Sequence, residues 1–190
     1  MSKELKNRVI GNDRGLSVVV TTLIILVVAV LLATVVCNYA TGLTLTRTKT
    51  EEVRISKERI WVNTTGAVAA FKLQNIGGKD LLVDGVVVRN IEADWSNVYF
   101  HRVPYGTTVS GGMNITSPLR LMGENVTIDG RMYAQAKMGI PLVSGGVVLF
   151  YVRGVTNIKI EDIGSTVSIR VYTNNAQYIK DCNVESATQQ

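Results

Sequence analysis

Side chains that could take part in catalysis are few and scattered in this 190-residue sequence. The one histidine, His101, has no cysteine or acidic residue near it at the spacing of a metal ligand. Glu161 and Asp162 are adjacent, so in a strand their carboxylates would point to opposite faces and could not act together as acid and base. The Gly-Gly pairs that begin at 77, 111 and 145 lack the lysine and helix of a phosphate-binding loop. The sequence therefore predicts no enzyme active site, no metal site and no cofactor.

Three Asn-x-Ser/Thr sequons point to a covalent chemistry of another kind. They are Asn63-Thr64-Thr65, Asn114-Ile115-Thr116 and Asn125-Val126-Thr127, and each lies beside residues that favour a turn. Because turns lie at the surface, a glycan attached there would project outward. We interpret Asn63, Asn114 and Asn125 as candidate N-glycosylation sites.

An uncharged run from Leu16 to Cys37 dominates the N-terminal part of the chain. As a helix, 22 residues would span about 33 Å, which matches one hydrocarbon core. Most of these residues are β-branched and would favour a strand in water. In lipid only a helix satisfies every backbone N–H and C=O within one segment, so the run predicts a membrane helix.

The residues around this run indicate where a signal peptidase would cut. Behind the run, Asn38 and Val36 are unsuited to a secretory or lipoprotein cleavage site, so the helix should stay with the protein. In front of it lies Arg14-Gly15-Leu16, where the permissive backbone of Gly15 suits a peptide that must extend into a protease. The leader Met1–Gly15 carries a net positive charge, which would keep it on the cytoplasmic side.

Arg14-Gly15 followed by Leu-Ser-Val-Val-Val-Thr-Thr-Leu-Ile-Ile-Leu-Val-Val resembles the class III signal of archaeal type IV pilin-like proteins, the adhesive pilins and archaellins. In that family a prepilin peptidase cuts after the glycine, which implies a cut between Gly15 and Leu16 here. The resemblance also implies that an assembly platform extracts the helix, which then packs with its copies as a filament core. The bacterial branch has a glutamate at the fifth mature position; this chain has Val20 and is similar to the archaeal branch, which lacks the acid.

The segment after the run carries two opposed signals. Charges at Arg47/Glu51 and Arg54/Glu58 are spaced i, i+4, as on the exposed side of a helix. Threonine at every second position from 44 to 50 favours extended chain instead. We predict that the helix continues to about Ile55, with a kink near Gly42, and forms a stalk.

From Arg59 onward, short Val- and Ile-rich runs alternate with turn signals. The spacing predicts seven to nine strands in an antiparallel sandwich. The segment Phe71–Gly78 resembles strand–turn pieces of immunoglobulin-like ectodomains of archaeal surface proteins. The predicted fold class is thus α+β: a leader at 1–15, a hydrophobic helix and stalk at 16–56, and an immunoglobulin-like β-sandwich at 57–190. The turn signals are Thr64-Thr65-Gly66, Asn75–Gly78, Asp84-Gly85, Ser110–Gly112, Gly123–Asn125, Asp129-Gly130, Ser144–Gly146 and Gly164-Ser165.

Charge and cysteine usage exclude two other classes of protein. The net charge is +5, but the basic residues are scattered, without interleaved aromatics, so no nucleic-acid surface is indicated. The two cysteines, Cys37 and Cys182, lie far apart in the sequence, one of them inside the apolar run. A disulfide-stapled secreted domain is therefore not expected.

These observations predict a structural subunit of an archaeal cell-surface filament used for adhesion or motility. Its partners would be copies of itself, the prepilin peptidase and the assembly platform, with the precursor held in the cytoplasmic membrane and the filament outside the cell. The alternative is a single-pass membrane protein with a binding β-sandwich ectodomain, and a third reading is an enzyme subunit tethered by this helix. The sequence does not distinguish adhesion from motility.

Overall fold

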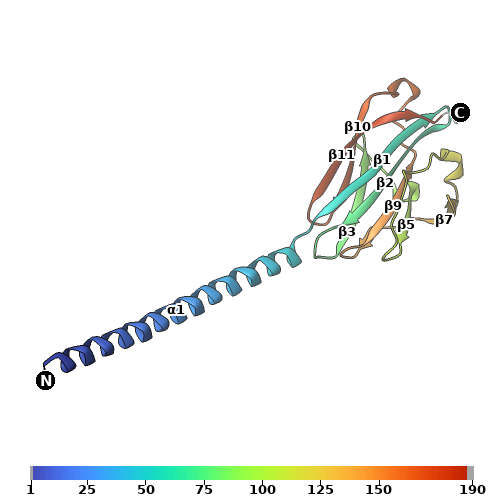
Figure 1. The fold of residues 1–190 in the computed structure, drawn as a ribbon. Coiled ribbons are helices and arrows are strands. Elements are labelled where there is room, and N and C mark those ends of the chain that lie inside the picture. Colours follow the sequence, from blue (N-terminus) through green and yellow to red (C-terminus); the bar gives the residue numbers. More distant parts are fainter. Residues whose placement is uncertain (1, 188–190) are drawn as a thin grey trace. The chain divides into compact units, whose positions relative to one another are not determined.

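The computed structural model describes the backbone of residues 2–187 and the side chains of residues 15–45 and 49–187. The chain divides into two compact units, of which the first ends at Arg47 and the second begins at Thr48 (Figure 1). The first unit is helical and the second is built of strands. Each is described here by itself.

The first unit is formed by the helix α1 (Ser2–Lys49), whose last two residues belong to the second unit, and the helix continues through Gly42 without a break. The predicted helix over Leu16–Cys37 is confirmed. The predicted extension to about Ile55 is wrong, because the chain is a strand from Val53. Val53 and Ile55 bury their side chains in the sheet, being only 8% and 9% exposed, so tertiary packing outweighs the i, i+4 charge spacing.

The second unit contains eleven strands in one hydrogen-bonded sheet (Figure 1). Their order is β4-β3-β10-β11-β1-β2-β9-β5-β7-β6, with β8 paired to β3. All pairings are antiparallel except β1 with β11, which is parallel. The strands are β1 (Val53–Asn63), β2 (Gly66–Asn75), β3 (Leu81–Val88), β4 (Ile91–Glu92), β5 (Val98–Val103), β6 (Asn125–Ile128), β7 (Arg131–Gln135), β8 (Ile140–Leu142), β9 (Val147–Arg153), β10 (Thr166–Thr173) and β11 (Gln177–Ser186).

The sheet curls, so that its central strands bury both of their faces. Ile60, Phe71 and Phe150 belong to a core that also includes side chains of β3, β8 and β10. Trp61 and Tyr151 belong to a second core on the opposite face. This arrangement explains why β2 and β9 are almost continuously apolar instead of alternating.

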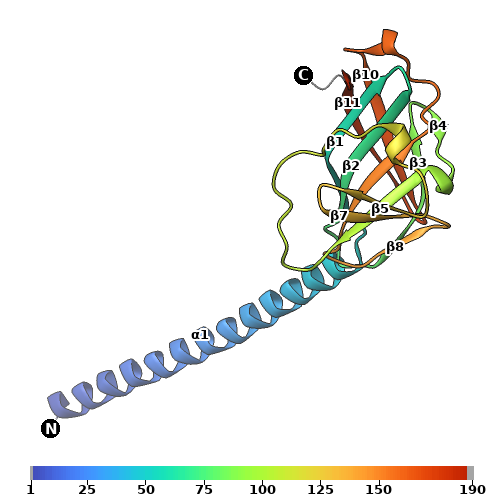
Figure 2. The ribbon, with the colours of Figure 1, turned by 90° about the vertical axis from the view of Figure 1, so that its right-hand side faces the viewer.

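Two segments cover the second core. One is the β6–β7 hairpin, which contributes Val126, Ile128 and Tyr133. The other is the long loop 104–124 between β5 and β6, drawn in yellow-green in Figure 2, which contributes Met113 and Leu121. A long helix followed by a mostly antiparallel β unit is confirmed as the fold class. The curled sheet is a half-barrel rather than clearly a sandwich, and it has more strands than the seven to nine predicted.

Several predicted turns are present, and one is wrong. Thr64-Thr65 joins β1 to β2, and Asp129-Gly130 joins β6 to β7 with positive φ angles of 50° and 70°. Asp84-Gly85 lies inside β3 and is not a turn; the pairing of β3 with β10 shifts there by one residue, as at a β-bulge. An isolated glycine inside a strand often marks such a bulge.

Candidate functional site

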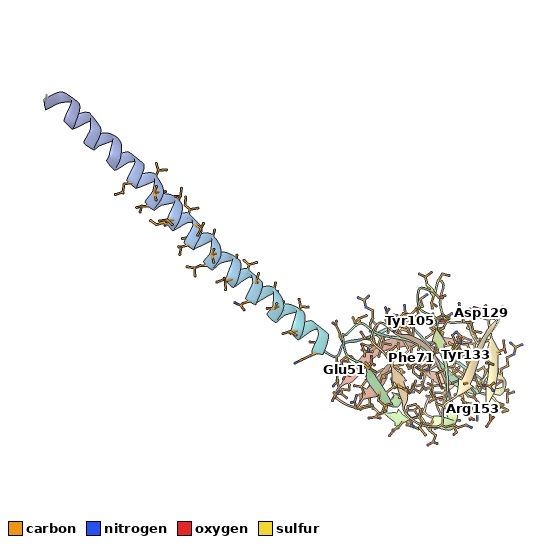
Figure 3. All side chains as sticks on the ribbon, turned by 90° about the horizontal axis from the view of Figure 1, so that it is seen from below. Glu51, Phe71, Tyr105, Asp129, Tyr133 and Arg153 are labelled. Carbon is orange, nitrogen blue, oxygen red and sulfur yellow. The ribbon has the colours of Figure 1, made fainter. Side chains whose placement is uncertain are left out.

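Helix α1 carries most of the exposed large apolar side chains of the described residues. Between Leu16 and Leu45 every large apolar side chain is between 48% and 70% exposed. Figure 3 shows these side chains projecting from all sides of the helix. Burying one Val, Leu or Ile side chain is worth about 1.5–3 kcal/mol, so leaving so many in water would be very unfavourable. The helix therefore requires an apolar environment that its own unit does not provide.

The polar side chains of α1 are compatible with such an environment. Thr21 Oγ1 donates to the Ser17 carbonyl at 2.8 Å, and Thr34 Oγ1 donates to the Val30 carbonyl at the same distance. Asn38 Nδ2 donates to the Thr34 carbonyl at 3.0 Å. Because the two threonine hydroxyls donate within the helix, they need no acceptor from lipid or another chain, and Asn38 directs one of its two N–H groups inward in the same way. Thr22, Thr41 and Thr44 bond in the same way to preceding carbonyls.

The predicted cleavage site lies within α1. Leu16 is 70% exposed, and no atom lies within 4 Å of the position that a Cβ would take at Gly15. The side chain of Arg14 lies outside the described side chains. A protease binds an extended peptide, so the helix must unwind locally before a cut between Gly15 and Leu16. Gly15 lowers the cost of that step, since glycine disfavours a helix by about 1 kcal/mol relative to alanine.

The three sequons lie in different surroundings. Asn125 and Thr127 are both exposed on β6. Asn114 is exposed, but the third residue of its sequon, Thr116, is only 4% exposed. Asn63 ends β1 and is partly buried, while Thr65 is exposed. The sequence finds all three asparagines but gives no sign of these differences, which arise from the packing of distant segments.

His101, Glu161 and Asp162 are the residues whose side-chain types could serve in catalysis. His101 lies on β5, and its Nδ1 is 2.8 Å from the carbonyl oxygen of Met132. Glu161 and Asp162 lie in a short 3₁₀ helix, Ile160–Asp162, and not in a strand as assumed from the sequence. Among the described residues no group of three or more His, Cys, Asp or Glu side chains could hold a metal ion.

Asp162 has the most clearly perturbed carboxylate. It forms an ion pair with Arg89, in which Nη1 and Oδ2 are 2.6 Å apart, and its Oδ2 also accepts from the Lys159 N–H at 2.8 Å. The hydrogen bond from Arg89 is the main reason that the pKa of Asp162 lies below its usual value, and Asp162 in turn raises the pKa of Arg89. Asn157 Nδ2 also donates to the Arg89 carbonyl at 2.5 Å. The ion pair and this hydrogen bond together hold Arg89, which lies in the turn between β3 and β4.

The thiol of Cys182 is shielded by the sheet. It is partly buried on β11, and burial, with smaller contributions from Glu58, Glu185 and Asp181, raises its pKa to about 12. A protonated thiol is a weak nucleophile and a weak metal ligand. Cys182 is therefore a packing residue.

The fold and the helix together define a coarse class of protein. The chain has one N-terminal helix, Gly15–Leu45, that is long and apolar enough to cross a membrane, and a separate β unit after it. No protein-family model matches the chain, and a search of curated proteins returned no match. The helix could anchor the chain in a membrane.

Proposed function

We propose that this chain is a structural subunit of an archaeal cell-surface filament, whose apolar helices form the core and whose β units form the outer surface. The observation that supports the proposal best is the exposed apolar surface of α1 from Leu16 to Leu45. Packing against symmetry copies buries that surface on every side. The resemblance of the Arg14-Gly15 segment to class III signals supports the same function.

The intrahelical bonds of the polar residues make storage in a membrane compatible with later packing in a polymer. The hydroxyls of Thr21 and Thr34 present no unsatisfied donor to lipid, so the precursor helix can remain inserted. In a helical bundle the same surface packs by van der Waals contact. Transfer from lipid to bundle releases little free energy because both surroundings are apolar, so an assembly motor is expected to drive it.

A single-pass cell-surface protein is the second candidate. The same intrahelical hydrogen bonds favour it, because a helix that stays in lipid needs them equally. In that case the β unit would be the functional part and the helix only its anchor. The two candidates differ in whether the leader is removed and in whether the chain polymerises.

Intact-mass analysis of the protein sheared from cells tests the proposal. We expect the leader Met1–Gly15 to be absent, and negative-stain microscopy of the same material should show filaments that an antibody against the β unit decorates. A variant with Gly15→Val should keep its leader and should not reach the filament, whereas Gly42→Val, inside the same helix, should be processed normally. Finding the leader on exported protein, with no decorated filament, would leave the anchor as the function.

A further inference from the structure

Three hollows in the surface of the β unit meet at Asn63. Their volumes are about 370, 300 and 290 Å³, and Asn63 lines all three. The largest is at the lower end of the range for ligand clefts, which is about 300–1,000 Å³. Asn63 ends β1 and faces Gly66 across the two-residue turn Thr64-Thr65. A group attached to Asn63 thus starts at the centre of a preformed concave surface.

The amide of Asn63 is held in a fixed orientation. Its Oδ1 accepts hydrogen bonds from the Thr65 N–H at 2.9 Å and from Thr65 Oγ1 at 2.6 Å. No hydrogen bond of Nδ2 is found among the described residues. The oxygen is therefore tied to the sequon threonine, while the nitrogen, which is the atom that N-glycosylation modifies, remains free.

Thr116 lines the largest hollow, and its buried hydroxyl has no partner among the described residues. Thr116 is 4% exposed, and its Oγ1 is buried and makes no hydrogen bond. Its carbonyl accepts from Trp61 Nε1 at 2.6 Å, which holds the residue in place. A buried hydroxyl without a partner is unfavourable, so this one points to a polar ligand. The hollow is lined by Asn63, Ile115, Thr116, Ser117, Arg120 and Ala187.

The two smaller hollows add apolar surface next to polar groups. Ile160 lines both of them and is 48% exposed, and Ile163 lines one and is 44% exposed. Lys159 and Glu161 line the first of the two, the hollow of about 300 Å³. Pyranose rings have an apolar face and a rim of hydroxyls. The isoleucines could contact the face, and the charged side chains could bond to the hydroxyls.

We propose that Asn63 carries an N-linked glycan whose first sugar lies in the hollow between Asn63 and Thr116, with a sugar hydroxyl bonded to Thr116 Oγ1. In the modification, the bond from Nδ2 to C1 of the sugar forms, and the bond from C1 to the phosphate of a lipid-linked sugar donor breaks. The phosphate leaves with the electron pair, and one Nδ2 proton passes to a base of the transferase. The proposal requires only that the β unit lies outside the cytoplasm, which the filament and the anchor share.

The other two sequons lack this arrangement. None of the three hollows is lined by Asn114 or Asn125. The sequon of Asn114 has its threonine buried, so the folded chain presents it less well to a transferase than the exposed Thr65 of the Asn63 sequon. A glycan on Asn125 would project from an exposed strand and would not contact any of these three hollows.

Glycopeptide mass spectrometry of the full chain from its own cells tests the modification. We expect a sugar mass on the peptide that contains Asn63. The variant Thr64→Pro should abolish that mass, because proline at the middle position destroys a sequon. It leaves Asn63 and Thr65 unchanged, and residue 64 has no positive φ that would exclude proline. An unmodified Asn63 in wild-type protein would overturn the proposal.

A double-mutant cycle tests the proposed contact between the first sugar and Thr116, which we call the seat. Thr64→Pro removes the sugar, Thr116→Val removes the hydroxyl with little change of volume, and both are made in an Asn114→Gln background so that neither alters a second glycan. Without the sugar, Thr116→Val should leave the melting temperature unchanged or raise it, since a buried unpaired hydroxyl is lost. With the sugar, the same change should lower the melting temperature by roughly 2–4 °C.

The cycle has clear contrary outcomes. If Thr116→Val has the same effect with and without the sugar, a water molecule serves the hydroxyl and the seat is refuted. Asn125→Gln is the control, because removal of an unseated glycan should leave the melting temperature unchanged. If Thr64→Pro and Asn125→Gln behave alike, the sugar on Asn63 makes no contact with the hollow. Filament formation does not enter these measurements, so failure here leaves the proposed function standing.

Discussion

Gly77 is required by a close approach of the backbone. A Cβ at this position would lie 2.5 Å from the Thr50 carbonyl oxygen and 2.6 Å from the Glu52 nitrogen. The Gly77 N–H donates to the Glu52 carbonyl at 3.0 Å, and the Gly78 N–H donates to the Thr50 carbonyl at 3.2 Å. The segment that leads into β1 therefore runs against the β2–β3 turn. The sequence predicts the Gly-Gly turn. It does not predict the close approach of residues 50–52 to this turn, because the two segments are distant in the chain.

Replacing Gly77 with alanine should destabilise the β unit. The new Cβ would meet backbone atoms that cannot move without breaking the hydrogen bonds to residues 50 and 52, so we expect a loss of about 1–3 kcal/mol. Urea unfolding followed by tryptophan fluorescence measures it. Gly112→Ala is the matched control, since nothing lies within 4 Å of its Cβ position and its φ is not positive. Equal midpoints for the two variants would mean that the segment yields freely.

At the scale of elements, local patterns predict most of the fold but not its boundaries or its covering loop. The uncharged run predicts α1 and the turn residues predict most hairpins, because both signals lie in neighbouring residues. The end of α1 at Lys49 depends on the burial of Val53 and Ile55 against distant strands. The double-sided burial of β2 and β9 likewise depends on the loop 104–124.

Side-chain donors on the sheet hold the loop 104–124 through its backbone carbonyls. The single proton of Tyr99 Oη is shared between the carbonyls of Leu121 and Gly123, each 3.0 Å away. A carbonyl is present whatever the residue type, so the sequence of the loop carries no sign of this pairing. The remaining donors are Lys57 to Val109 and Gly111, Arg59 to Met113, Trp61 to Thr116, Tyr151 to Asn114 and Arg153 to Leu121.

Tyr99→Phe should loosen this loop while keeping the aromatic packing of the second core. Tyr99 is fully buried, so the loss of its hydroxyl removes the hydrogen bond that the Leu121 and Gly123 carbonyls share and should cost about 1–3 kcal/mol. Hydrogen exchange should rise over residues 119–124. The control is Tyr105→Phe, whose hydroxyl bonds to the Ser144 carbonyl at 2.8 Å but whose side chain is 74% exposed, so its effect should be within about 0.5 kcal/mol. A larger loss in Tyr105→Phe than in Tyr99→Phe would contradict this account.

At the scale of the whole molecule, the two units require different surroundings. The β unit has two cores of its own, in which Trp61, Phe71 and Phe150 are almost completely buried. Such a unit is stable in water without a partner. The helix has no core, because its apolar side chains are exposed along the whole of Leu16–Leu45. The helix therefore needs an apolar environment, which lipid would supply and which the proposed filament would supply through other copies of the chain, whereas the β unit is packed for water.

Replacing Val28 with lysine should separate insertion of the helix from its assembly. A lysine near the middle of Leu16–Cys37 costs about 3 kcal/mol for insertion, which the surrounding Leu, Ile and Val residues offset, so the precursor should still reach the membrane at lower yield. In a filament the same lysine would be buried among copies of itself, unpaired and facing like charges, in every subunit. We expect membrane fractionation to find the variant and microscopy to find no filaments, whereas Val28→Leu should do both. Normal polymerisation of the lysine variant would show that the helix does not form a packed core, because no dry bundle could hold an unpaired charge in each subunit.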